Sequence, residues 1–388
     1  MKLAEKRYCT GCEVCNNVCP KEAIKMEKEE EGYYFPKIDF NRCIECGLCE
    51  IVCPVLNDKS ERSYTSMYYG ASSKDTEIIL NSSSGGMFSE ILNAAYREES
   101  RKINVAGVIY ENDFKSVKHV LTSEIETINR MRGSKYIQSR KSNIYVEVKK
   151  KLFQGEFVIF TGTPCEVAAL RKYLAKDYDN LLCVDFICKG GACEDILAGY
   201  TDYLEKKYKN KVIDMNMRYK WKNLDVWIPQ FIRIEFRNGK QVVKEFYNTF
   251  LGHGFRILQR QACYNCKFRE NNYKSDITIG DYHGASKKEI SYNHLGTSAV
   301  IVNSEKGQKY LDLMRDRIVL EQISKEETFH DNRNTIDKKR NTLSEAMKEN
   351  PVIDAIRMQL SLKDKIKMVM PVGILRKSTT LYRKIRKK

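Results

Sequence analysis

Fourteen cysteines occur in the 388 residues of this chain, and eight of them lie close to its start. They form two copies of one spacing, C-x2-C-x2-C-x3-C-P. The first copy consists of Cys9, Cys12, Cys15 and Cys19 before Pro20, and the second of Cys43, Cys46, Cys49 and Cys53 before Pro54. A segment this short cannot bury a large apolar core. Bound metal must therefore supply much of its folding free energy.

Bacterial-type ferredoxins hold two [4Fe–4S] clusters with this spacing. Three cysteines of one run bind one cluster, and the fourth, turned away by the proline, binds the other. The predicted ligands are Cys9, Cys12, Cys15 and Cys53 for cluster one, and Cys43, Cys46, Cys49 and Cys19 for cluster two. The alternatives are paired zinc knuckles or a disulfide scaffold. Zinc sites commonly include histidine, and the first histidine of this chain is His119.

The sequence pattern between the two cysteine runs, and the pattern after them, predict how the chain is divided into domains. Gly32–Ile38 indicates a short strand, and Lys25–Glu31 an exposed, charged turn. Beyond a polar linker, apolar strands alternate with helical patterns, as in an α/β domain. The prediction is an α+β ferredoxin-like domain, a linker, an α/β domain with a mixed sheet and a basic helical tail, over residues 1–57, 58–66, 67–350 and 351–388.

Composition excludes several classes of protein. A hydrophobic content of 42% argues against general disorder and against collagen-like or low-complexity chains. No apolar run approaches the roughly 18 residues of a membrane-spanning helix. The first residues enter a cysteine motif without the apolar segment of a secretory signal. We therefore expect a cytoplasmic protein whose cysteines hold metal rather than disulfides.

Three junctions in the body place polar residues at the ends of predicted strands or the starts of helices. A serine- and glycine-rich turn, Ser82–Gly86, leads into a helix. The strand 156–160 ends in Thr161–Cys165, and the strand 181–187 ends in Cys188–Gly191. Helix N-termini favour anions, and ligands of open α/β sheets collect beyond the carboxyl ends of the strands. We expect Cys165 and Cys188 at one edge of the sheet, and Cys183 inside a strand as a core residue.

A last pair, Cys263 and Cys266, forms a lone C-x2-C. With Cys165 and Cys188 it makes four thiols, the number that a third [4Fe–4S] cluster requires. Cys193 could replace Cys188, and a structural zinc ion is the alternative occupant. The next strand, within Ser275–Gly284, ends in acidic and histidine side chains.

The order of these motifs resembles the beta-subunit family of coenzyme F420 hydrogenases and dehydrogenases. The resemblance extends over about residues 1–310 and is carried by the two cysteine runs and by NSSSGGMFSEI, MRGSKYIQS, GTPCEVAALRKYL, CYNCKF and SDITIGDYHG. It implies an iron–sulfur flavoprotein in which FAD exchanges a hydride with a two-electron partner while the clusters carry single electrons. Relatives in other lineages reduce chlorophyll precursors with ferredoxin, so the resemblance implies the cofactors more firmly than a substrate.

The resemblance also assigns residues to the cofactors. It implies Cys165, Cys188, Cys263 and Cys266 as ligands of a core cluster. The α/β domain would bind FAD through Ser84, Gly85, Gly86, Arg132, Gly133, Ser134, Lys135, Tyr136, Thr161, Gly162 and Thr163. Arg132 and Lys135 would meet the FAD phosphates, unless they form a solvated basic face.

Two departures from the family pattern border the expected flavin site. Lys189–Cys193 stands where the family has a histidine and a Gly-Val-Pro-Ser-like run, and His283 stands where it has a tryptophan. The hydride partner therefore stays open. Asp281 and His283 are the candidate acid and base, with structural hydrogen bonding as the alternative role.

The formal charge of +16 is concentrated near the end of the chain. Residues 356–388 contain eleven Lys or Arg and one acid, Asp364. Leu362, Ile366 and Val369 recur there at helical spacing among lysines. Such a segment lies on an anionic membrane surface or packs on the body with solvated lysines. No recognised nucleic-acid-reading module accompanies the charge, so no nucleic-acid partner is expected.

The predicted function is that of an iron–sulfur flavoprotein oxidoreductase with three [4Fe–4S] clusters and FAD. Its partners would be an external electron carrier, ferredoxin or coenzyme F420, and an unidentified substrate or partner enzyme. The chain would either be F420-linked or use ferredoxin to reduce an organic substrate. The competing hypotheses are a non-catalytic electron-transfer subunit that docks on a separate enzyme, and a scaffold with structural zinc.

Overall fold

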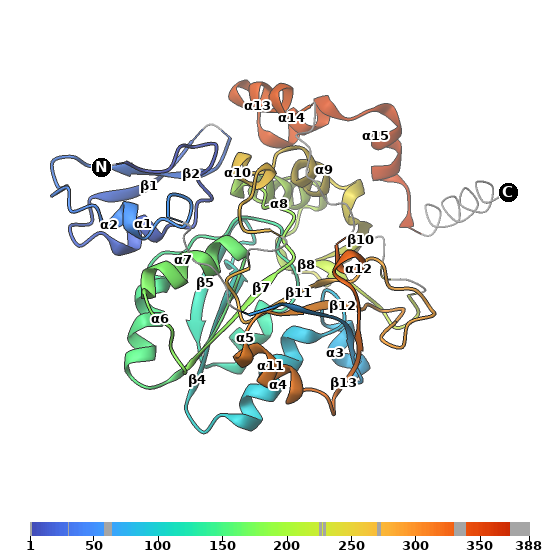
Figure 1. Ribbon diagram of the computed structural model, residues 1–388. Coiled ribbons are helices and arrows are strands. Elements are labelled where there is room, and N and C mark those ends of the chain that lie inside the picture. Colours follow the sequence, from blue (N-terminus) through green and yellow to red (C-terminus); the bar gives the residue numbers. More distant parts are fainter. Residues whose placement is uncertain are drawn as a thin grey trace.

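The computed structural model describes residues 2–29, 31–57, 64–224, 227, 230–269, 273–329 and 339–372. Its N-terminal part is a small α+β unit beside the body (Figure 1). The unit consists of α1 (Val14–Val18), β1 (Ile24–Lys28), β2 (Tyr34–Ile38) and α2 (Leu48–Ile51). β2 confirms the expected strand, and β1 pairs with it antiparallel. The expected turn over Lys25–Glu31 is therefore wrong at its start, because Ile24 is buried while Lys25 and Glu27 point to solvent on a strand.

The two cysteine runs share one backbone conformation. In each run the residues on both sides of the second cysteine have positive φ: 67° at Gly11 and 62° at Glu13, 52° at Glu45 and 73° at Gly47. This left-handed region is unfavourable for residues other than glycine. Its recurrence at matching positions shows that the sequence repeat is also a structural repeat.

Of the expected linker 58–66, residues 58–63 lie outside the described part of the chain.

The body is built on one eight-stranded sheet, with the strand order β13-β3-β12-β11-β7-β6-β4-β5. Its strands are β3 (Met67–Ser73), β4 (Ile103–Tyr110), β5 (Val117–Thr122), β6 (Phe157–Gly162), β7 (Leu181–Phe186), β11 (Ile277–Asp281), β12 (Ser298–Val302) and β13 (Ile318–Gln322). The neighbours β4, β6, β7 and β11 are parallel, and the outer pairings are antiparallel. The expected mixed sheet is confirmed.

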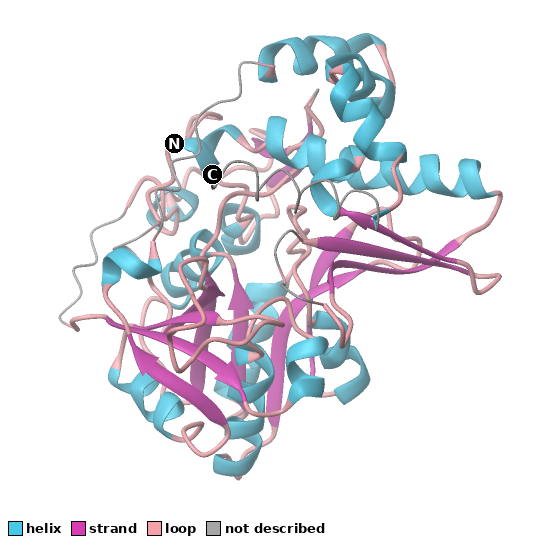
Figure 2. Cartoon of the chain, turned by 90° about the vertical axis from the view of Figure 1, so that its right-hand side faces the viewer, coloured by secondary structure: helices cyan, strands magenta, loops and turns pink. Residues whose placement is uncertain are grey.

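Helices cover both faces of this sheet (Figures 1 and 2). They are α3 (Thr76–Leu80), α4 (Met87–Glu98), α5 (Ile125–Met131), α6 (Ile144–Phe153), α7 (Pro164–Leu174), α11 (Glu305–Asp312) and α12 (Lys325–Thr328). Along β6, Phe157 and Ile159 pack with α4 and α11, whereas Val158 and Phe160 pack with α6 and α7. This alternation is the period of a strand that is buried on both sides.

A second layer follows in the chain and contains a three-stranded antiparallel sheet, β10-β9-β8, which extends to the right in Figure 2. The layer comprises α8 (Glu194–Tyr208), β8 (Val212–Tyr219), β9 (Phe231–Phe236), β10 (Gln241–Glu245), a 3-10 turn (Phe246–Asn248), α9 (Phe250–Ile257) and α10 (Gln261–Tyr264). Three C-terminal helices pack near it: α13 (Arg340–Glu349), α14 (Val352–Gln359) and α15 (Leu362–Val369). Within the described ranges, every helix is too short or too polar to cross a bilayer.

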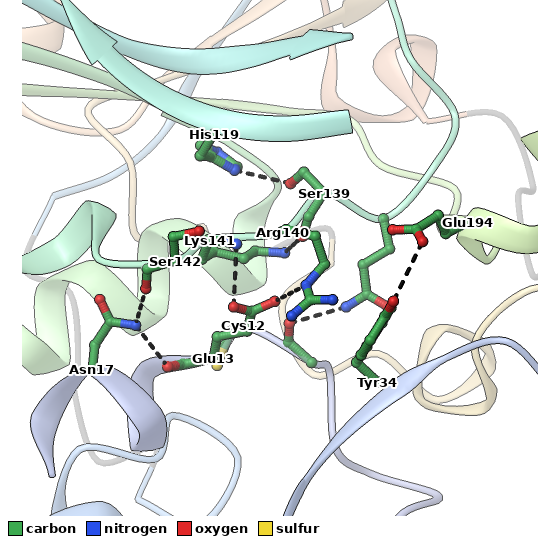
Figure 3. A network of polar contacts seen from close by, with 12 residues as sticks. Cys12, Glu13, Asn17, Tyr34, His119, Ser139, Arg140, Lys141, Ser142 and Glu194 are labelled. Carbon is green, nitrogen blue, oxygen red and sulfur yellow. Dashed lines mark hydrogen bonds and ion pairs between the residues drawn. The ribbon is translucent and has the colours of Figure 1, made fainter. Parts of the chain in front are cut away.

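Buried polar contacts join the N-terminal unit to the body (Figure 3). The Glu13 carboxylate accepts a hydrogen bond from the backbone amide of Lys141 and lies 3.3 Å from Nε of Arg140. The Lys141 ammonium lies 2.7 Å from the Glu166 carboxylate, and both side chains are almost fully buried. Burial alone would raise the pKa of Glu166, but Lys141 and the neighbouring His119 lower it to about 2. The pair is therefore charged. Through its side chain Lys141 contacts the helix that carries Cys165, and through its backbone amide it contacts Glu13 beside Cys12.

Replacing Lys141 by methionine should test the buried ion pair between Lys141 and Glu166. Lys141→Met leaves the buried Glu166 carboxylate without its cation, and breaking a buried pair in this way costs about 3–5 kcal/mol. We expect a decrease of that size in the free energy of urea unfolding. Lys150→Met on the exposed side of α6 is the matched control and should change it by about 0.5 kcal/mol or less. Equal effects of the two substitutions would contradict the assignment.

Candidate functional site

The structure brings the predicted ligands of cluster one together. Burial raises the pKa of the Cys12 thiol, and the neighbouring thiols of Cys9 and Cys53 raise it further. The pKa of Cys15 is raised by burial and then by Cys12, Cys9 and Cys53. These charge effects require short distances. The fourth thiol of the group therefore comes from the second run, as crosswise ligation requires.

The predicted ligands of cluster two line one small cavity. Cys19, Cys43, Cys46 and Cys49 surround it together with Ile24, Ile44 and Leu48. Cys46 is exposed, whereas Cys9 and Cys12 of the other group are buried. The two groups therefore differ in access: cluster two would lie at the outer surface and cluster one against the body.

Four thiols from three distant segments meet in the body. Cys165 lies in the first turn of α7, Cys188 follows β7, and Cys263 and Cys266 lie in and just after α10. Burial raises the pKa of Cys165, and the charges of Glu166, Cys266 and Cys188 raise it further. The pKa of Cys188 is raised by burial, Cys263 and Cys266. The predicted core quartet is thus one group of neighbours.

Cys193, the alternative to Cys188, has different surroundings from the quartet. It precedes α8 and is buried in the hydrophobic core of the second layer. Burial and its neighbour Asp195 raise the pKa of its thiol to about 12. Cys183 is fully buried inside β7, as expected.

A zinc ion would need four ligand atoms within about 2.3 Å of one point. In the described part of the chain, no three Cys, His, Asp or Glu side chains are gathered around the position of a single ion.

A large cavity of about 320 Å³ opens beside the quartet. Three of the four thiols line it, namely those of Cys165, Cys188 and Cys263. Nine of the predicted FAD contacts also line it: Ser84, Gly86, Arg132, Gly133, Ser134, Lys135, Tyr136, Thr161 and Thr163. Gly85 and Gly162 are not in the lining. Gly85 lies against the sheet, where a Cβ atom would approach the carbonyl oxygen of Ala71 to 2.5 Å.

One end of the cavity suits an anionic group. α4 begins there, and its first residues lack a side-chain cap, so their amides are available to a ligand. The hydroxyl groups of Ser83 and Ser134 lie 2.9 Å apart beside it. Arg132 lines the cavity, and its buried Nε has no hydrogen-bond partner in the described part of the protein. These features fit the pyrophosphate of a dinucleotide.

Lys135 is arranged differently from Arg132. Its ammonium donates to the carbonyl oxygens of Met131, Arg132 and Gly133 at 3.1–3.3 Å, which closes the end of α5. Burial, helped by the charge of Arg130, lowers the pKa of Lys135 to about 7. The side chain already has three acceptors, so a phosphate contact from Lys135 stays a prediction.

The candidate acid and base, Asp281 and His283, lie at the end of β11 and also line the cavity. Burial alone would raise the pKa of Asp281, but Arg218 holds it below its ordinary value through hydrogen bonds of 2.7 and 3.1 Å. Asp281 is therefore a carboxylate and not a proton donor at neutral pH. The ring of His283 stacks on Trp227 with centroids 6.0 Å apart, and its Nε2 lies 3.9 Å from Asp281.

Sequence reasoning missed two arginines that shape this region. Arg218 on β8 also donates to the Tyr136 hydroxyl and to the Ser83 carbonyl, so it joins three walls of the cavity. Arg260 is 2% exposed and lies between the N-terminal unit and the quartet. The sequence offered one signal for Arg260, its position three residues before Cys263. That position does not reveal that Arg260 contacts the N-terminal unit.

Comparisons with known proteins identify relatives of two parts of the chain. The family model for the C-terminal part of the coenzyme F420 hydrogenase/dehydrogenase beta subunit matches residues 155–328. The "4Fe-4S dicluster domain" family matches residues 8–57 and confirms the predicted N-terminal ferredoxin domain. One of the subunits of the F(420)H(2) dehydrogenase from Methanosarcina mazei is 25% identical over 335 residues, which cover 82% of this chain and 85% of the relative. A chain of the F420-reducing [NiFe] hydrogenase complex from Methanosarcina barkeri, from a xenon-derivatised structure, covers 77% of this chain and 91% of its own length, with a TM-score of 0.47 and 16% identity.

Two alanine substitutions separate the quartet from the neighbouring cysteine. Three [4Fe–4S] clusters correspond to about 12 irons per chain. Cys188→Ala should lower the iron content of anaerobically purified protein to about 8. Cys193→Ala is the matched control and should leave the iron content unchanged, because Cys193 lies in the hydrophobic core. Loss of iron from the Cys193 variant alone would show that Cys193, and not Cys188, is the ligand. Zinc in the unaltered protein would contradict the proposal of a core [4Fe–4S] cluster.

Proposed function

Because the chain belongs to the coenzyme F420 hydrogenase/dehydrogenase beta-subunit family, whose members are oxidoreductase subunits, we propose that it is an iron–sulfur flavoprotein. It would pass electrons between a two-electron partner at FAD and one-electron carriers through three [4Fe–4S] clusters. One observation carries the proposal: a single cavity is lined both by the predicted FAD contacts and by three thiols of the core quartet.

The chain's own residues would hold the flavin in a defined orientation. Arg132, Ser83, Ser134 and the amides that begin α4 suit the pyrophosphate. The rings would lie against the apolar part of the lining, which includes Met87, Phe88, Val108, Met131, Phe186, Ile187 and Ile279. When bound, FAD supplies the exchange between two-electron and one-electron chemistry. The protein would hold the flavin in place and keep water away from the quartet.

Cluster one and the quartet share a boundary. Cys53, Cys165 and Cys266 pack against one small hydrophobic group formed by Val55, Ala168 and Phe268. The ligands of two predicted clusters thus contact the same side chains. This proximity favours transfer of single electrons between the N-terminal unit and the body.

Arg260 is a buried charged group near this boundary. Its guanidinium donates to the carbonyl of Cys9 at 2.6 Å and to Gln138 at 2.8 Å, and it lies 3.8 Å from the Cys9 sulfur. It also opposes the burial that raises the pKa of Cys263. One buried cation therefore acts on a ligand of each site. Hydrogen bonds and positive charge near the sulfurs raise the reduction potential of a cluster.

The outer face of the N-terminal unit suits an external one-electron carrier. Cys46 is exposed there, and Ile44 and Leu48 line the cavity of cluster two. Phe40, Ile44 and Ile51 are 72%, 58% and 62% exposed. Exposed apolar side chains around a redox centre are typical of weak, transient docking surfaces.

Coenzyme F420 is the proposed hydride partner, because the relative from Methanosarcina mazei is named for reduced F420. Asp281 is held as a carboxylate by Arg218, so it would orient a ligand through Arg218 rather than donate a proton. The alternative within the same class is ferredoxin-dependent reduction of an organic substrate. A non-catalytic electron-transfer subunit would lack the flavin.

Anaerobic mixing with reduced coenzyme F420 tests the proposal. The purified protein should contain about one FAD and about 12 irons. Reduced F420 should bleach the flavin absorbance, and the EPR signals of reduced clusters should follow. Flavin that stays oxidised would remove the F420-linked option and leave the ferredoxin-dependent one. Full iron content without FAD would favour the non-catalytic subunit.

Arg260→Met tests whether this buried cation raises the reduction potential at the boundary between cluster one and the core quartet. Loss of the buried cation should lower the midpoint potential of cluster one by on the order of 50 mV, close to a tenfold change for a one-electron couple. Redox titration followed by EPR measures this shift. Arg260→Lys should recover part of it, because the charge returns without the guanidinium hydrogen bonds. Arg237→Met in an exposed turn is the control, and an unchanged potential in Arg260→Met would contradict the role.

A further inference from the structure

α15 carries three of its apolar side chains on the outside. Leu362, Ile366 and Val369 recur at helical spacing and are 75%, 45% and 74% exposed. No residue of this helix is buried. A surface helix ordinarily turns its apolar stripe toward the core. α15 does the reverse.

The contacts of the opposite face fix this orientation. Met368 packs partly against the core of the second layer. The carboxylate of Asp364 caps the helix at Ser361 and lies close enough to His253 and Arg256 for their charges to lower its pKa, after the stronger effect of the Ser361 hydrogen bond. At the other end, the Lys244 ammonium donates to the carbonyl of Met370 at 3.1 Å. Both ends of α15 are therefore tied to the body through its inner face.

Lysines flank the exposed stripe on both sides. With 100° between successive residues, Leu362, Ile366 and Val369 lie within one narrow arc, Lys365 borders it on one side and Lys363 on the other. Both lysines are exposed. The only acid of the helix, Asp364, lies on the inner face. The outer surface of α15 is thus an apolar strip with positive edges.

We propose that this outer surface of α15, which we call the α15 stripe, lies on an anionic lipid surface. The long lysine stems extend to the phosphate level while the apolar side chains enter the interface. Positive edges match the negative charge of anionic lipids. Three apolar side chains give weak and reversible attachment rather than insertion. The proposal does not depend on the redox function.

Vesicle co-sedimentation of the full-length protein tests the proposal. The probes are phosphatidylcholine vesicles with about 30% phosphatidylserine and vesicles of phosphatidylcholine alone. We expect binding to the anionic vesicles at low ionic strength, a strong decrease in binding as salt is added, and little binding to the neutral vesicles. Absence of binding to the anionic vesicles would overturn the proposal.

Two double variants separate the contributions to binding. Leu362→Gln with Val369→Gln should weaken binding about tenfold or more, because the apolar contacts are lost. Lys363→Gln with Lys365→Gln should weaken it about fivefold per lysine and flatten the salt dependence. All four side chains are exposed, so the fold should be unaffected, which circular dichroism checks.

The matched control replaces exposed apolar residues elsewhere. Phe153 and Ile290 are 68% and 77% exposed, and Phe153→Gln with Ile290→Gln should bind anionic vesicles as the unaltered protein does. An equal loss of binding in this control would overturn the proposal. So would a concentration-dependent dimer that the Leu362 and Val369 variant abolishes, since the stripe would then be covered by a second copy of the chain.

Discussion

The parallel pairing of β6 with β7 is the constraint on which the cysteine quartet and its cavity depend. Gly162 stands opposite Asp185 in this register, so both strands end at the same edge of the sheet. α7 begins immediately after β6 and presents Cys165 there, while Cys188 follows β7 by two residues. β11 pairs parallel with β7 and brings Asp281 to the same edge. A slip of one residue in either pairing would turn alternate side chains to the opposite face and separate these groups.

The N-terminal unit packs on the body through contacts that involve its first cysteine loop. Tyr145 donates to the Cys12 carbonyl at 2.8 Å, Gln138 to those of Thr10 and Gly11, and Arg260 to that of Cys9. The side chains of the body therefore hydrogen-bond the first cysteine loop directly. Gly11 suits this contact, because its φ of 67° strains other residues and a Cβ atom there would displace the Gln138 side-chain amide. Loop conformation and docking thus depend on each other.

Local sequence patterns predicted the parts of this structure that local chemistry determines. The cysteine spacing, the strand ends beside Thr161 and Cys188, and the helix after Ser82–Gly86 follow from neighbours in the chain, and the structure has them. The turn expected over Lys25–Glu31 failed because charge indicates exposure, and a strand with one solvated face is also exposed. Arg218, Arg260 and Lys141 could not be predicted from the sequence, since their partners lie 63, 251 and 25 residues away.

Two exposed apolar surfaces in the described part of the chain lie far apart, and this separation has a functional consequence. Phe40, Ile44 and Ile51 belong to the N-terminal unit, whereas the α15 stripe lies beyond the second layer on the other side of the body (Figure 1). Exposed apolar area is unfavourable unless a partner covers it at least part of the time. Because neither surface blocks the other, a chain attached through α15 keeps Cys46 and its surroundings accessible. Attachment at one end is therefore compatible with the exchange of single electrons at the other.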